Sequence, residues 1–169
     1  MCFGNDGMGC EDDIAAVERV ERAVSLFEEG FSCSQAVLGA YSERFGLACE
    51  AALKLSAGFG GGMKMAGTCG AVTGALMVIG LKHGHSDAAD KEGKRKVGAL
   101  IKDFVARFKE RNYSLTCKEL LGCDISTPQG KQEAEEKNLT QTICPKYVHD
   151  AARILDEMLS LDGNYDSTD

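Results

Sequence analysis

The stretch KVGALIKDFVARF, residues 96–108, carries apolar side chains at the spacing of one helix face. Those side chains are Val97, Leu100, Ile101, Phe104, Val105 and Phe108. Intervals of three and four residues bring them onto one stripe of an α-helix, while most of the charged residues between them face solvent. Similar stripes recur along the chain, and no long segment alternates with a period of two. The sequence therefore predicts an all-α protein, a compact bundle of about five to seven helices.

On both sides of this stretch, glycines and cap residues delimit further helices. Their expected ranges are 13–30, 32–46, 50–57, 68–84 and 144–160, with a short helical turn at 116–121. The glycine-rich segment GFGGGM, residues 58–63, is expected to be a loop. Residues 127–139 are polar and are expected to be loop or weak helix.

The chain is long enough for one domain with its own core. We expect a flexible arm over residues 1–12, a single all-α domain over 13–160 and a disordered tail over 161–169. The net charge of −7 argues against nucleic acid and against an anionic membrane surface, because phosphate contacts need clustered Lys and Arg. The uncharged run over residues 66–81 is too short to cross a bilayer. With no sign of a secretion signal, we expect a cytoplasmic protein.

Eight cysteines are more than packing requires, and structural disulfides are disfavoured in a reducing compartment. Four of them share one position, at the start of a predicted helix and of its apolar stripe. Ser32 with Gln35, and Thr116 with Glu119, have the spacing of capping boxes, and proline is favoured in a first helical turn. Cys33 follows Ser32, Cys69 follows Thr68, Cys117 follows Thr116, and Cys144 precedes Pro145. We therefore predict that Cys33, Cys69, Cys117 and Cys144 converge on one site.

A helix N-terminus favours an anion, because it has unpaired N–H groups and roughly half a positive charge. A thiol placed there can have a pKa lowered from about 8.5 to between roughly 3.5 and 7.5, and the thiolate is the form that binds metal and attacks disulfides. Any one such cysteine is more often a small packing residue. Four such placements favour a shared metal-cluster or dithiol site over coincidence.

The other four cysteines lack this pattern. Cys2 and Cys10 lie in the expected arm, where a thiol could contact a partner or simply oxidise, and packing is favoured for Cys49 and Cys123 near helix ends. Cys123 is six residues from Cys117 and is a substitute ligand or a resolving thiol in a second interpretation. No C-x-x-C or C-x-x-C-H is present, so a thioredoxin motif, a paired-cysteine zinc finger and covalent haem are not expected.

Glycines concentrate around Cys69. The candidates for contact with a cofactor are Gly58, Gly60, Gly61, Gly62, Gly70 and Gly74, and close helix packing is the favoured alternative for the last two. Surface or capping roles are favoured over metal ligation for His83, His85 and His149, because no His pair has ligand spacing on a helix.

The chain resembles the family of redox-active proteins named for its C…GCAxxG…C…C pattern. The resemblance rests on CSQAVL (33–38), GFGGGM (58–63), TCGAVTGALMV (68–78), CKELLG (117–122) and the lone Cys144, and it covers about residues 15 to 160. The order here is Cys69-Gly70-Ala71, which differs from the written label but is the usual form of the family. The resemblance assigns the shared cysteines to Cys33, Cys69, Cys117 and Cys144. It also implies kinship with the iron–sulfur part of split-Soret cytochromes, so that this chain would keep at most the cluster.

The expected function is electron transfer or redox sensing by an iron–sulfur cluster of unspecified type on these four cysteines. The alternatives are a metal-free thiol–disulfide carrier and a structural four-cysteine zinc module; zinc ranks lower because its ligands usually come in close pairs. We assign no catalytic residues, since the sequence contains no convincing acid–base pair or nucleophile–histidine arrangement. A redox partner protein is expected, and glycine-rich helix faces favour a homodimer.

Overall fold

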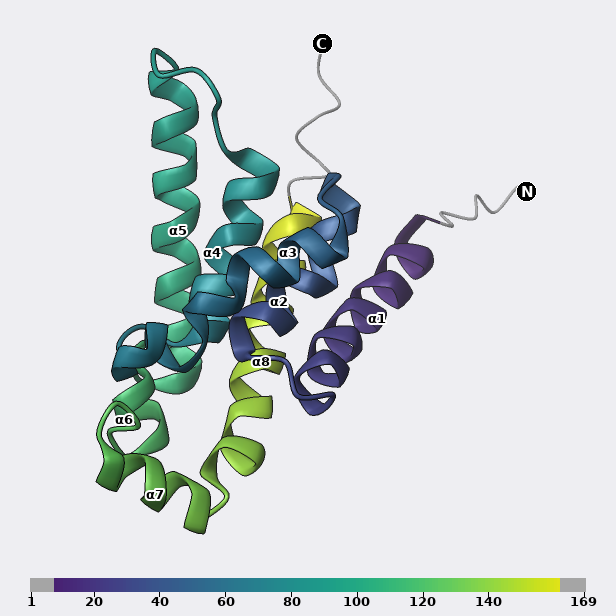
Figure 1. Cartoon of the computed structure of the whole chain (residues 1–169). Coiled ribbons are helices and arrows are strands. Elements are labelled where there is room, and N and C mark those ends of the chain that lie inside the picture. The colour runs from purple at the N-terminus through teal and green to yellow at the C-terminus, as the bar shows by residue number, and fades with distance from the viewer. Residues whose placement is uncertain (1–7, 162–169) are drawn as a thin grey trace, which may run out of the picture.

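The computed structural model describes the backbone of residues 8–161 and the side chains of residues 16–160. This part of the chain contains eight α-helices and no strand, which confirms the all-α class but exceeds the five to seven helices predicted (Figure 1). The additional helix lies where loop or weak helix was expected, because Thr127 caps it and Pro128 opens it. The helices are α1 (Met8–Glu28), α2 (Cys33–Tyr41), α3 (Cys49–Ser56), α4 (Gly70–His83), α5 (Lys91–Asn112), α6 (Cys117–Leu121), α7 (Pro128–Glu136) and α8 (Leu139–Leu161).

The ends of the chain differ from the expected boundaries. Helix α1 begins at Met8, so residues 8–12 of the predicted arm belong to a helix. Leu161, the first residue of the predicted tail, ends α8. Residues 1–7 of the arm and 162–169 of the tail lie outside the described residues.

Helix α2 lies at the centre of the bundle. Seven of its nine residues are buried, because α1, α3, α4 and α8 all pack against it. In Figure 1, α1 lies on one side of α2, and α4 and α5 lie on the other. Helices α6 and α7 and the first turns of α8 gather at one end. The N-terminus of α2 lies close to α4, since a Cβ on Gly70 would stand 3.1 Å from Cys33 Cβ.

The crossing of α2 and α4 depends on a glycine. A Cβ at Gly74 would stand 2.8 Å from the carbonyl oxygen of Ser34 and 3.1 Å from Val37 Cβ. Without a side chain at Gly74, the two helix backbones approach closely. The structure therefore favours the packing interpretation of this residue over contact with a cofactor.

A buried polar network joins α1, α2 and α8. The Tyr41 hydroxyl lies 2.8 Å from Asp156 Oδ2 and 2.8 Å from the carbonyl oxygen of Ala152. Arg19 of α1 pairs with Asp156 at 2.7 Å. Because Asp156 is 5% exposed, these two partners compensate for much of the cost of its burial.

The glycine loop before α4 has an unusual backbone. Gly61, Gly62, Met63, Lys64 and Ala66 all have positive φ, between 53° and 62°. The three residues with side chains each cost roughly 1–2 kcal/mol in this left-handed region. Only glycine fits at position 62, since a Cβ there would lie 2.4 Å from the nitrogen of Gly67. Backbone strain of this kind is retained where the surrounding structure requires a particular path, often at functional sites.

Candidate four-cysteine site

The four cysteines singled out in the sequence line one cavity of about 610 Å³. They come from four separate elements: Cys33 from α2, Cys69 from the start of α4, Cys117 from α6 and Cys144 from α8. Each is buried, with exposed fractions between 3% and 8%. None of the six cysteines with described side chains forms a disulfide. The fold thus brings together four free thiols that are far apart in the chain.

Three of the four cysteines lie at helix starts as predicted. Cys33 and Cys117 are the first residues of α2 and α6, and Cys69 is itself the N-cap of α4. The prediction that Thr68 caps α4 was wrong, because Thr68 pairs with Thr116 in an antiparallel bridge. Gln35 accepts the Ser32 N–H at 3.0 Å, as a capping box requires.

The capping box at Thr116 is only half formed. The Thr116 side chain accepts the N–H of Glu119 at 3.4 Å. The return bond is absent from this described segment, since the Thr116 N–H donates to the Ser114 hydroxyl at 3.0 Å. The Glu119 carboxylate accepts from that same hydroxyl. Ser114 therefore occupies the place that the sequence assigned to Glu119.

The prediction that Cys144-Pro145 begins the last helix was wrong. Helix α8 begins at Leu139, with the Thr142 N–H bonded to the carbonyl oxygen of Asn138 at 3.1 Å. Pro145 is therefore inside the helix, where its ring costs one backbone hydrogen bond. Cys144 consequently lies in the second turn, away from the unpaired N–H groups of a helix start.

Backbone hydrogen bonds hold two of the cysteines beside each other. The Cys69 N–H donates to the carbonyl oxygen of Leu115 at 2.7 Å, and the Cys117 N–H donates to that of Gly67 at 2.6 Å. These two bonds flank the Thr68–Thr116 bridge. The spacing of Cys69 and Cys117 is therefore determined by the backbone and does not depend on their own side chains.

Burial controls the protonation of these thiols. It raises the pKa of Cys69 to about 11, although N–H groups of Ala71 and Val72 act in the opposite direction. Burial raises the pKa of Cys117 to about 12, and the neighbouring Cys69 and Cys144 add to the rise. The favourable helix start is thus outweighed by desolvation, contrary to the expectation of lowered pKa values.

Cys33 and Cys144 behave as a pair. A hydrogen bond from the Cys33 thiol lowers the pKa of Cys144 and raises that of Cys33, and burial raises the pKa of Cys33 further. The one thiol with a lowered pKa is therefore the one that does not lie at a helix start. With no cation present, the site favours at most one thiolate, shared between these two residues.

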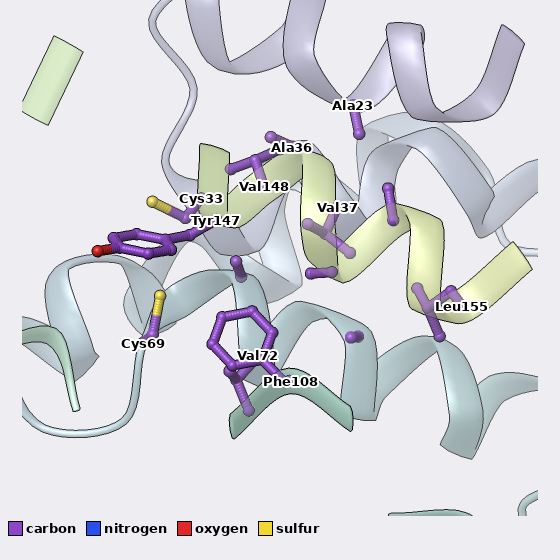
Figure 2. Close-up of a cluster of buried hydrophobic side chains, with 14 of the residues drawn as sticks. Ala23, Cys33, Ala36, Val37, Cys69, Val72, Phe108, Tyr147, Val148 and Leu155 are labelled. Carbon is purple, nitrogen blue, oxygen red and sulfur yellow. The ribbon is translucent and has the colours of Figure 1, made fainter. Parts of the chain in front are cut away.

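Tyr147 belongs to the site, although the sequence analysis missed it. Figure 2 shows its ring beside the side chains of Cys33 and Cys69. Its hydroxyl donates to the carbonyl oxygen of Leu120 at 2.9 Å, which ties α8 to α6. Burial raises the pKa of Tyr147 to about 12, so it stays a neutral donor. Its position one turn after Cys144 was the available signal.

The six candidate glycines have different surroundings. Gly61 and Gly70 line the cavity, whereas Gly74 packs on α2. A Cβ on Gly60 would lie 2.4 Å from Ser32 Cβ, so Gly60 lets the loop pass the start of α2. Gly62 closes the strained turn, and Gly58 has no atom near its Cβ position and does not line the cavity.

Cys49, Cys123 and the three histidines do not line the cavity. Cys123 is buried near enough to Cys117 to affect its pKa, and Cys49 is half-buried with its thiol 3.9 Å from the carbonyl oxygen of Gly39. The side chains of Cys2 and Cys10 lie outside the described residues. His83 ends α4 and His85 follows it, while His149 is exposed beside Asp150.

Comparison with known families shows to which family this chain is related. The family described as putative redox-active protein (C_GCAxxG_C_C) matches residues 31–158. The chain belongs to this family. The family match contains all four cysteines of the cavity, and it begins after α1. No curated protein and no solved structure matches the chain.

Membership of the redox-active family agrees with the chemistry of the cavity, whose conspicuous reactive groups are thiols. Among residues 16–160, however, no three His, Cys, Asp or Glu side chains are arranged to hold a single metal ion. No helix within residues 8–161 is long and apolar enough to span a bilayer. The thiols of the family pattern therefore line one cavity.

Proposed function

We propose that this protein holds an iron–sulfur cluster on Cys33, Cys69, Cys117 and Cys144 and uses it to transfer or sense electrons. The observation that supports this most is the convergence of four buried thiols, from four elements, on one cavity. Four thiolates are the usual ligand set of such clusters, and soft sulfur ligands disfavour hard cations. The cluster, when bound, would supply one-electron chemistry.

A cluster and a single zinc ion make different demands on four thiolates. Zinc bonds thiolate sulfur at about 2.3 Å, so four sulfurs on one zinc ion lie roughly 3.8 Å from one another. No such single-ion arrangement exists among the described side chains. In a cluster the thiolates bind different irons, which places the cysteine sulfurs further apart. The cysteines also lack the close sequence pairs that are usual for zinc ligands, which supports the cluster over the zinc module.

The charge of the site also favours a bound cation. The hydrogen bond with Cys144 and burial oppose the ionisation of Cys33, and burial and the neighbouring thiols oppose that of Cys69 and Cys117, so four thiolates would be unstable here without positive charge. Binding of iron would release the thiol protons and replace them with metal charge. The first N–H groups of α2 and α4 would favour the negative charge that remains on the sulfurs.

Purification of the full chain under anaerobic conditions tests the proposal. We expect visible absorption and stoichiometric iron and sulfide in the wild type. Cys33→Ser, Cys69→Ser, Cys117→Ser and Cys144→Ser should each lose most of the iron, whereas Cys49→Ser and Cys123→Ser should retain it. A colourless, iron-free wild type would refute the cluster, and stoichiometric zinc in its place would establish the zinc module.

A metal-free thiol–disulfide carrier is a second candidate, which the Cys33–Cys144 hydrogen bond supports. A thiol of lowered pKa beside a second thiol is the usual pair in disulfide exchange. This candidate predicts a reversible Cys33–Cys144 disulfide. Differential alkylation and mass spectrometry of the oxidised and reduced protein would detect it, and unchanged alkylation of both residues would exclude it. A cytoplasmic location and a homodimer stay predictions of the sequence.

A further inference from the structure

The cysteine cavity has a buried floor and an exposed rim. Cys33, Cys69, Cys117 and Cys144 lie on the floor together with Leu120 and Tyr147, all of them buried. The rim includes Glu28, Lys64 and Gln141, all of them exposed. The thiols are therefore reached from solvent through the cavity, although each is itself covered. Metal sites that only stabilise a fold are closed, whereas sites that act on a substrate keep an open side.

The size and the walls of the cavity suit a small organic molecule. Its volume of about 610 Å³ lies within the range of roughly 300–1,000 Å³ that is typical of ligand pockets. Between rim and floor the walls include Phe27, Phe31, Leu121 and Ile125, with Ser32, Gln35 and Thr140 as polar exceptions. Such a wall would contact the apolar body of a ligand and leave its polar group near the rim.

Lys64 is the single cation among the residues that line this cavity. Its ammonium group forms no hydrogen bond or ion pair with any residue in the described part of the chain. The left-handed turn of the glycine loop holds its backbone at φ 61°. Lys64 also lines an adjoining hollow, which shares Ile125 and Thr140 with the cavity and contains a second lysine, Lys131. The carboxylates in the two linings are those of Glu28 and Glu135.

We propose that the cavity binds a small organic carboxylate with an apolar body. The carboxylate pairs with Lys64 at the rim, and the body lies against Phe27 and Phe31 above the cysteine floor. An unpaired ammonium group held at the edge of an apolar pocket is the chemistry that selects such a ligand. That this carboxylate is a substrate of the redox site rests on the proposed function. That the cavity binds it does not depend on the proposed function.

Calorimetric titration of the anaerobically purified full chain tests this inference. The probes are benzoate, phenylacetate and cinnamate, each compared with its neutral amide. We expect at least one carboxylate to bind at least tenfold more tightly than its amide, with weaker binding at high salt. Lys64→Gln should reduce that affinity about tenfold, and Lys64→Arg should restore it. Lys54→Gln is the matched control, because Lys54 is an exposed lysine on α3 outside the cavity lining and should have no effect.

A second measurement locates the ligand. The bound carboxylate should slow the alkylation of Cys33 and Cys144 and leave Cys49 unchanged. Absence of binding by all three acids, equal affinity for acid and amide, or an unaltered Lys64→Gln variant would each overturn the inference. Iron measured in the same samples separates the two proposals. Bound iron without carboxylate binding would support the cluster and refute the ligand site. Carboxylate binding without iron would support the ligand site and refute the cluster.

Discussion

Thr68 and Thr116 face each other in an antiparallel bridge. The backbone hydrogen bonds on either side of this bridge hold Cys69 and Cys117 close together. The bonds involve only backbone N–H and carbonyl groups. Serine at either cysteine position would keep them, so the Cys69→Ser and Cys117→Ser variants report the loss of sulfur and not the loss of the local fold. Cys69 and Cys117 are close in space because the segment that follows α5 pairs with the end of the glycine loop.

Tyr147 is predicted to position Cys117 relative to Cys144. Tyr147→Phe keeps the ring but leaves the Leu120 carbonyl oxygen without its donor, which should cost about 1 kcal/mol of unfolding free energy. Because α6 is then less firmly held, alkylation of Cys117 should accelerate more than alkylation of Cys33. Quantitative mass spectrometry of the reduced, metal-free protein measures both rates.

Tyr41→Phe is the matched control for this variant. It also removes a buried hydroxyl that contacts a carbonyl oxygen of α8, but Tyr41 does not line the cavity. It should lower stability and leave the ratio of the two alkylation rates unchanged. Equal ratios in both variants would contradict a positioning role for Tyr147.

The metal-free protein is predicted to lose stability at alkaline pH. Burial raises the pKa of Cys69 to about 11 and that of Cys117 to about 12, above roughly 8.5 in an unfolded chain. The folded state therefore holds these protons more tightly, and this contribution to stability is complete below about pH 8.5 and lost as the pH rises through the folded values. Urea midpoints should be constant from pH 6 to 8 and fall above pH 9.

The double variant Cys69→Ser/Cys117→Ser should show a weaker alkaline decrease, since its hydroxyls do not ionise in this range. Cys49→Ser should follow the wild type. A pH profile of the double variant identical to that of the wild type would show that other groups cause the decrease.

Gly74 is predicted to be required for the contact between α2 and α4. Gly74→Ala places a methyl group 2.8 Å from the Ser34 carbonyl oxygen, and the resulting displacement of the helices should cost about 1–3 kcal/mol. Gly80→Ala lies on the same helix with no atom within 4 Å and should be neutral or stabilising by up to about 1 kcal/mol. Thermal unfolding compares the two; similar effects would mean that helix propensity, and not the crossing, determines the result.

Arg19 is predicted to stabilise the attachment of α1, the helix that precedes the family match. Arg19→Met leaves the buried carboxylate of Asp156 without its cation and should cost about 3 kcal/mol. Arg22→Met breaks an exposed pair with Glu29 and should change stability by less than about 1 kcal/mol. Adding Asp156→Asn to Arg19→Met should recover part of the loss. A double variant as unstable as the sum of the singles would argue against the ion pair.

Most of the helices could be predicted from local spacing. The stripe from Val97 to Phe108 lies in α5, and the Ser32–Gln35 capping bond marks the start of α2. Errors arose where a distant segment supplies the partner. Thr68 pairs with Thr116 and so does not cap α4, and Ser114 displaces Glu119 from its capping bond. Cys144-Pro145 suggested a helix start because proline is favoured in a first helical turn, yet α8 begins at Leu139, and Leu139 and Ile143 pack against the core.

The sequence by itself determined the helical class and the set of four cysteines, because helix periodicity and thiol chemistry are properties of short segments. Only the tertiary structure decided how those cysteines behave. Their shared cavity, the raised pKa values of Cys69 and Cys117 and the Cys33–Cys144 pair arise from burial among helices that are distant in the chain. Tyr147 and Lys64 became part of the site for the same reason: a residue's surroundings are set by packing, which local sequence does not contain.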